Sequence, residues 1–417
     1  MAEISSPVYI DKHGSLTTAK ASYYFVLFTL CFLSSTLGGT VSTLMSVYLP
    51  VVVKELMGNM PVETMNDAGA FINAVFIFGW TLGGVVWGLI CDKAGRKKSF
   101  ILSTACYGLF TLLTALASNW YWVVGCRFMS GFGVGGVLVT TTIFIVEAWS
   151  EKKRAIALGI LSISIPVGIF SAGLINYFLS TWRQAFLVGT IPLLLALVSA
   201  FVLQESAADK KLSNGNQQSK MADEYFFAPP YRKNLLIGSI VFGTMLIGLW
   251  AIFSWLPTWV QTLSTEADAQ HGRGISMMIL GMGGLTGGFI SGWIVNALGL
   301  RKTMIACFAV CFAMAFILFK LNVSFSGAAY IELALLALFF GISQGALSVY
   351  IPQLFPGNVR ASATGFCFNI GRLFTAVAVF FVGSLVVFFG GYSNAIFIFS
   401  FVFVIGLIAT LINKSVQ

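Results

Sequence analysis

The strongest constraint on this chain is a motif that it contains twice. Residues 83–98 read GGVVWGLICDKAGRKK, an apolar, glycine-spaced stretch that runs into Asp92 and a basic cluster. Its counterpart begins 204 residues downstream and spans 287–302, with the same three glycines and Asn296 in place of Asp92. Glycines at this spacing let a neighbouring helix approach closely within lipid, and basic residues beside a helix end favour the cytoplasmic side. The chain is therefore expected to consist of two similar halves of membrane-spanning helices.

The composition supports a membrane protein. The chain is 58% hydrophobic and 9% charged, whereas a soluble protein carries roughly 25% charged residues. Long apolar runs favour helices over a barrel, so the predicted fold class is an all-α membrane protein with twelve transmembrane helices in two pseudo-symmetric six-helix bundles. The predicted spans are 22–52, 69–91, 99–117, 120–147, 155–179, 184–203, 234–262, 274–298, 303–321, 328–352, 361–388 and 392–412.

The distribution of basic residues predicts the orientation. With both termini cytoplasmic, the inner segments carry 18 of the 24 Lys and Arg residues, and the outer segments carry only Lys54, Arg183, Arg273 and Lys320. This asymmetry explains the net charge of +9 without a nucleic-acid partner. We expect a multi-pass protein of a bacterial inner membrane that works as a monomer in the lipid bilayer.

One long polar stretch separates the two halves. Residues 205–233 are rich in Ser, Asn, Gln, Lys and Asp and contain two adjacent prolines. This composition is typical of a linker rather than a domain. The predicted organisation is an N-terminal bundle at 1–204, a cytoplasmic linker at 205–233 and a C-terminal bundle at 234–417.

A second signature also occurs in each half, at the cytoplasmic end of a span. Glu147 and Arg154 follow the fourth span with six residues between them, and Gln353 and Arg360 follow the tenth with the same spacing. Opposed charges at helix ends can bridge helices when the inner side is closed and separate when it opens. The alternative is that these charges only set topology or are solvated. The predicted gating residues are Asp92, Arg96, Glu147, Arg154 and Arg360.

Two arginines lie inside the predicted spans, Arg127 about eight residues into the fourth and Arg372 about eleven into the eleventh. A charge at this depth costs at least about 2.5 kcal/mol and usually faces a watery cavity with a partner. The first span offers no acidic residue. One hypothesis is that a carboxylate substrate completes the pair, because guanidinium groups bind carboxylates bidentately. The alternative is that both arginines bond backbone groups and brace helices.

Six further residues within the spans could complete a substrate pocket. Two are amides nearest midspan, two lie toward the outer and inner ends, and two are aromatic residues of the seventh span that could stack on a substrate. For each, a packing role is the alternative. They are Gln344 and Asn369, Asn73 and Tyr350, and Trp250 and Trp255.

The two repeated signatures resemble those of the major facilitator superfamily, and the resemblance covers the whole chain. Within that family, GFCFNIGRLF at 365–374 is most similar to bacterial symporters for carboxylates such as aromatic acids, muconate or lactate. The resemblance implies two bundles that rock about a midplane site in alternating access. Together with the arginines, it implies a secondary transporter for a small organic anion, a carboxylate, that is coupled to protons or exchanges anions.

The chain departs from its apparent relatives in two ways. The seventh span lacks the paired glutamines of sugar porters, and the first span lacks the acid of many proton symporters. The proton would then be carried by Glu147, Glu332, Asp67 or the substrate itself. The alternative function is transport of a neutral sugar or polyol, or drug export, with both arginines as braces.

An enzyme is not expected. The two histidines, His13 and His271, lie in loops, and no span contains a nucleophile–base pair or a metal-binding cluster. We expect no metal and no cofactor.

Overall fold

The computed structural model describes residues 8–10, 16–18, 21–58, 60–149, 151–204, 228–265, 268–322, 324, 326–356 and 359–413. These residues are almost entirely helical, which confirms the predicted fold class. The exception is a short antiparallel pair of strands, β1 (Val8–Ile10) and β2 (Leu16–Thr18).

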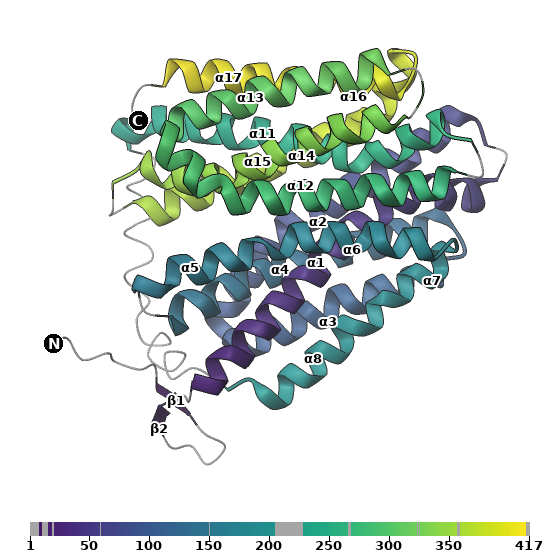
Figure 1. Cartoon of the computed structure of the whole chain (residues 1–417). Coiled ribbons are helices and arrows are strands. Elements are labelled where there is room, and N and C mark those ends of the chain that lie inside the picture. Colours follow the sequence, from purple (N-terminus) through teal and green to yellow (C-terminus); the bar gives the residue numbers. More distant parts are fainter. Residues whose placement is uncertain are drawn as a thin grey trace.

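The first half forms one bundle, coloured purple to teal in Figure 1. Its helices are α1 (Ala21–Met57), α2 (Val62–Ala94), α3 (Arg96–Thr114), α4 (Trp120–Ala148), α5 (Glu151–Ser162), α6 (Ser164–Phe178), α7 (Trp182–Phe186), the 3-10 helix η1 (Leu187–Gly189) and α8 (Thr190–Val202).

The second half forms the other bundle, coloured green to yellow in the upper part of Figure 1. Its helices are α11 (Pro229–Leu263), α12 (Ala269–Leu298), α13 (Leu300–Phe316), the π-helix η2 (Ile317–Leu321), α14 (Gly327–Gln353), α15 (Arg360–Phe388), α16 (Tyr392–Phe399) and α17 (Phe401–Ile412).

Each of the twelve predicted spans is helical. Eleven of them are long and apolar enough to cross a membrane. The remaining one corresponds to α3, which begins with three consecutive basic residues, Arg96, Lys97 and Lys98. The predicted linker at 205–233 lies largely outside the described residues, and α11 already begins at Pro229, inside the range given to the linker. The division into two domains stays a prediction.

Two spans of each half are interrupted, although we expected continuous helices. The fifth span is divided into α5 and α6, the sixth into α7, η1 and α8, the ninth into α13 and η2, and the twelfth into α16 and α17. Pro166 and Pro192 lie in the first turn of α6 and of α8. Proline is tolerated in a first turn but cannot continue a helix from the N-terminal side, so these two breaks have a sequence cause.

The repeated glycines make the same contact in both halves. A Cβ atom on Gly83 of α2 would lie 2.0 Å from the carbonyl oxygen of Phe132 in α4, and one on Gly287 of α12 would lie 2.0 Å from that of Leu338 in α14. Only glycine therefore permits these helix pairs to come so close. The loops after α2 and α12 also match, because Gly95 and Gly299 adopt φ angles of 94° and 82°, where glycine is favoured.

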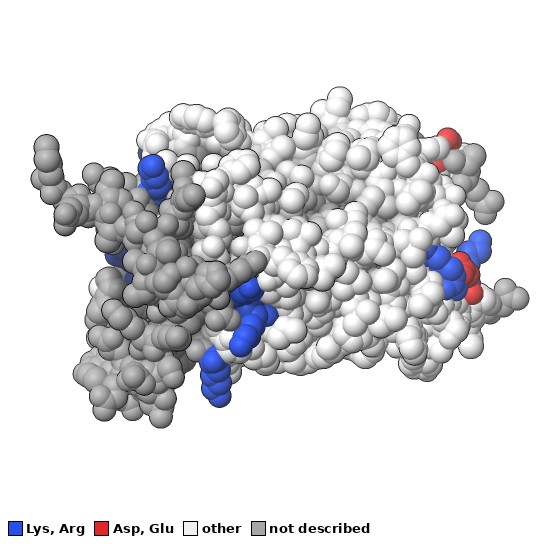
Figure 2. Space-filling view, turned by 90° about the horizontal axis from the view of Figure 1, so that it is seen from below, with Lys and Arg blue, Asp and Glu red and all other residues white. Residues whose placement is uncertain are grey.

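The two bundles meet along three helix pairs. Helix α6 packs against α12, α2 against α15, and α1 against α11. We call the end where α1 ends and α2 begins the outer end, and the opposite end, where α1 begins and α17 ends, the inner end. In Figure 2 the charged side chains visible at the inner end, on the left, are Lys and Arg, whereas both signs are visible at the outer end. This distribution agrees with the predicted orientation, which stays a prediction.

Hydrogen bonds across the interface close the outer end. The Tyr392 hydroxyl donates to Oδ1 of Asn66, and Nε2 of Gln270 donates to the carbonyl oxygen of Asn176 at 2.9 Å. A third and longer bond, at 3.5 Å, joins Nδ2 of Asn73 in α2 to a carbonyl oxygen of α11. All three connect one half to the other.

Candidate substrate path

Arg127 is bound to the backbone of a neighbouring helix. Its side chain is 1% exposed, and Nη1 and Nη2 donate to the carbonyl oxygens of Val41 and Ser42 in α1 at 2.9 and 3.3 Å. Its Cζ atom lies 3.9 Å from the centroid of the Phe76 ring. This cation therefore joins α4 to α1 and α2, which is the bracing geometry considered as an alternative above.

Arg372 lies in the second half and is held differently. Its side chain is half-buried in α15, and among the described residues it makes no hydrogen bond or ion pair. Its described contact is aromatic, with Cζ 6.0 Å from the centroid of the Trp80 ring. Since a guanidinium carries five N–H donors, this group keeps its hydrogen-bonding capacity for something other than the described protein atoms.

An aromatic bridge links the surroundings of the two arginines. Phe76 and Trp80 are one turn apart on α2, with ring centroids 6.0 Å apart. Trp80 meets Trp250 of α11 edge-on at 5.3 Å. The chain of contacts thus runs from Arg127 in the first half to Arg372 and Trp250 in the second. The sequence analysis missed Phe76 and Trp80, whose signal was an aromatic pair at helical spacing just before the glycine motif.

Two predicted amides are compatible with a central site. Nε2 of Gln344, on α14, is buried and has no hydrogen-bond partner among the described atoms. Asn369 is half-buried on α15, three residues before Arg372 and so on a neighbouring part of the same helix face. Both offer donors that a polar substrate could use.

Three other predicted pocket residues are used elsewhere. Asn73 is engaged in the closure of the outer end, as described above. The hydroxyl of Tyr350 accepts a hydrogen bond from Asn413 at 3.1 Å, at the inner end of the second half. The ring of Trp255 lies 5.6 Å from that of Tyr392, toward the outer end.

The predicted gating residues form bonds within their own halves. Arg96 and Glu147 make an ion pair of 2.9 Å between α3 and α4, with Arg96 almost fully buried. Arg154 donates to the carbonyl oxygen of Trp149 at 3.5 Å. In the second half, Arg360 donates from Nε to the carbonyl oxygen of Phe355 at 3.1 Å. The side chain of Asp92 lies outside the described part of the structure.

The structure therefore combines a closed outer end with predicted gating residues that each bond within their own half. Two bundles that bond at one end and enclose polar groups near their common midplane have the architecture of an alternating-access transporter. The family model for the Major Facilitator Superfamily matches residues 24–379, and the chain belongs to this superfamily. It is thus a multi-pass membrane transporter and not an enzyme.

Similar proteins carry named substrates. The sialic acid transporter NanX of Escherichia coli is 28% identical over 338 residues, which cover 79% of each chain. The cis,cis-muconate transport protein of Acinetobacter baylyi is 26% identical over 373 residues, covering 86% of this chain and 87% of its own. The crystal structure of a D-xylose–proton symporter superposes with a TM-score of 0.78 at 17% identity, covering 95% of this chain and 98% of its own, which confirms the fold.

Proposed function

We propose that this transporter moves a small organic anion, a carboxylate, by alternating access and that this transport is coupled to protons. The observation that carries the proposal is the half-buried Arg372, which has no hydrogen bond or ion pair with a described residue. A buried cation without a counter-ion is costly, and a carboxylate would supply both the charge and the acceptors that a guanidinium fork matches.

The surroundings of Arg372 suit a carboxylate with an apolar or unsaturated body. Trp80 and Trp250 offer ring faces and edges beside the cation, and Gln344 offers an unused buried donor. Sialic acid and cis,cis-muconate, named for two similar proteins, are both carboxylates. They support the class of cargo and do not identify it.

A neutral cargo is the second candidate, and one observation favours it. Arg127 already has protein acceptors for Nη1 and Nη2, and only its buried Nε has no acceptor among the described atoms, so most of its bonding is met without an anion. If Arg372 found equivalent acceptors in the opposite conformation, both arginines would be braces. A sugar, a polyol or an apolar drug would then fit the same path.

The experiment compares acids with their uncharged counterparts. Purified protein is tested by thermal shift against N-acetylneuraminate, cis,cis-muconate and nicotinate, each paired with its methyl ester, which for muconate is the dimethyl ester. Because a ligand of the native state raises the unfolding temperature, we expect at least one acid to stabilise the protein and its ester to be inactive. The Arg372→Gln variant should lose this stabilisation, whereas Lys320→Gln, which removes a cation at the outer end, should keep it.

Two results would contradict the proposal. One is equal stabilisation by the esters or by neutral sugars; the other is no response to any acid in the panel. Coupling is tested separately in proteoliposomes, where adding the stabilising acid should drive an inward proton flux. Uptake of the acid without a change in internal pH would contradict proton coupling, whereas the proposed anionic cargo would remain.

A further inference from the structure

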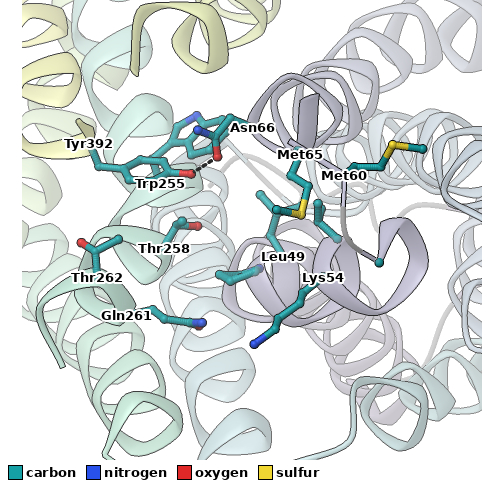
Figure 3. A pocket seen from close by; sticks show the side chains of 14 residues that line it. Leu49, Lys54, Met60, Met65, Asn66, Trp255, Thr258, Gln261, Thr262 and Tyr392 are labelled. Carbon is teal, nitrogen blue, oxygen red and sulfur yellow. Dashed lines mark hydrogen bonds between the residues drawn. The ribbon is translucent and has the colours of Figure 1, made fainter. Parts of the chain in front are cut away.

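A cavity of about 500 Å³ lies at the outer end, between the two halves. Its walls come from α1 and α2 on one side and from α11 and α16 on the other (Figure 3). This volume falls in the range of small-molecule sites. The cavity is separate from the surroundings of Arg372, and neither the family assignment nor the proposed cargo path accounts for its chemistry.

Two buried donors on the α11 wall have no partner. Nε1 of Trp255 and Oγ1 of Thr258 make no hydrogen bond with a described atom, although their side chains are 1% and 8% exposed. A buried polar group without a hydrogen-bond partner destabilises the protein. A ligand with acceptor atoms would remove this cost for Thr258 if its side chain turned the hydroxyl group into the cavity.

A third donor is oriented by a buried arginine. Arg273 of α12 is 3% exposed and donates from Nη1 to Oε1 of Gln261. Because arginine has donors only, the oxygen of the Gln261 amide must face it, and the NH₂ end is left for the cavity. The sequence analysis placed Arg273 in an outer segment, just before the eighth span, and so missed this role. Glycines on both sides of it were the sign of a closely packed helix.

The fourth group is a cation. Lys54 lines the cavity and makes no ion pair with a described residue, since its neighbour Glu55 is bound to Trp182 at 2.6 Å and to Arg183 at 3.0 Å. In Figure 3 the ends of Lys54 and Gln261 point toward each other across the cavity. No Asp or Glu is among the described lining residues, whereas Leu49 and Met65 supply apolar surface.

We propose that this cavity is an external binding site for an amphipathic carboxylate. The carboxylate would lie between Lys54 and the donors of Gln261 and Thr258, and its apolar body would lie against Leu49 and Met65. The donor-rich polar lining and the absence of a lining acid among the described residues select an anion. The apolar walls select one with a hydrophobic body rather than a small inorganic ion.

The position of the site gives it a consequence for transport. Its walls belong to both halves, and the hydrogen bond from Tyr392 to Asn66 closes the outer end beside it. A ligand that contacts both walls binds only while the outer end is closed, so it must stabilise that conformation and slow the return to the outward-open one. The inference needs alternating access but does not need Arg372 to bind the cargo.

The test uses 3-phenylpropionate as the probe and 3-phenylpropionamide as its uncharged control. Binding to the purified protein is measured by calorimetry. Spin labels at Tyr121→Cys and Leu321→Cys, on exposed positions of the two halves at the outer end, report the distance between them. We expect the acid to bind and to hold the shorter distance, and the amide to do neither.

The variants separate this site from the central one. Lys54→Met keeps the side-chain stem and should weaken binding at least tenfold, the loss expected for one charge-assisted bond. Thr258→Val is nearly isosteric and provides a second variant in case the first folds poorly. Lys320→Met, at the same end but outside the cavity, should bind as the wild type does. Because the proposed central site would also accept this acid, Lys54→Met and Thr258→Val are measured again in an Arg372→Gln background, where they should weaken the remaining binding by the same factor.

Three outcomes with the wild type and the cavity variants would overturn the proposal, and a fourth concerns Arg372→Gln. They are equal binding of acid and amide, unchanged binding in both Lys54→Met and Thr258→Val, and no binding of the acid at all. Loss of binding in Arg372→Gln alone would show that the probe occupies the central site, which would support the proposed cargo and reject the external site.

Discussion

Arg127 and Arg372 differ in how many of their donors meet protein acceptors. Arg127 makes two hydrogen bonds to α1 and stacks on Phe76. Among the described residues, the contact of Arg372 is with the Trp80 ring. The two substitutions Arg127→Met and Arg372→Met should therefore have different effects. Hydrogen bonds to a charged group contribute about 1.5–3 kcal/mol each, so the first should lower the unfolding temperature markedly and the second should not.

Thermal unfolding in detergent measures both variants under one condition, in the absence of substrate. Arg372→Met should instead lower the affinity for substrate, because the interaction that it removes is made with the bound substrate and not with the protein. Equal losses of stability would mean that Arg372 is also a brace. The idea of an anionic cargo would then lose its main support.

At the level of the helices, the glycine motif contains one glycine that packs tightly against a neighbouring helix and one that has free space around it. A Cβ on Gly83 would lie 2.0 Å from the carbonyl oxygen of Phe132, whereas one on Gly88 would meet its nearest atom at 3.9 Å. Gly83→Ala should force α2 and α4 apart and destabilise by at least about 1–3 kcal/mol. Gly88→Ala should be neutral or stabilise by up to about 1 kcal/mol, because alanine favours helix.

Unfolding temperatures of the two variants give the comparison directly, since both substitutions add one methyl group to the same helix. A Gly83→Ala protein as stable as the wild type would show that the helices separate at no cost. The same pair can be made in the second half, where Gly287 is tight and Gly292 has nothing within 4 Å. Matching results would show that both copies of the motif have one structural role.

A structural feature can be predicted from this sequence when the residues that determine it lie close together in the chain. The helices follow from long apolar runs, and the close α2–α4 contact follows from glycine spacing, because both causes lie within one stretch. The breaks at Pro166 and Pro192 were readable but were missed. The different hydrogen bonding of Arg127 and Arg372 could not be predicted, because the acceptors of Arg127 lie about 85 residues away in the sequence, on another helix.

The outer cavity shows the same limit more strongly. Its donors come from α1 and α11, more than 200 residues apart, and the amide of Gln261 is turned by Arg273 from a third helix. No periodicity or motif places these groups together. Only the packing of one half on the other does so.

For the whole molecule, the conformation depends on a small number of bonds between the halves. Tyr392 of α16 donates to Asn66 of α2, and because this bond joins the two halves, we expect opening of the outer end to break it. A net hydrogen bond contributes about 1 kcal/mol, which corresponds to about a fivefold change in a two-state equilibrium. Tyr392→Phe should therefore shift the population toward the outward-open state by about this factor.

Tyr350→Phe is the matched control. It also removes a buried tyrosine hydroxyl, but the partner of Tyr350 is Asn413, in the same half, so the loss is equal in both conformations. Distances between spin labels at the outer end should broaden toward longer values in Tyr392→Phe and stay unchanged in Tyr350→Phe. If both variants shifted alike, the effect would come from lost packing, and closure would have to depend on the glycine-lined contact of α6 with α12 instead.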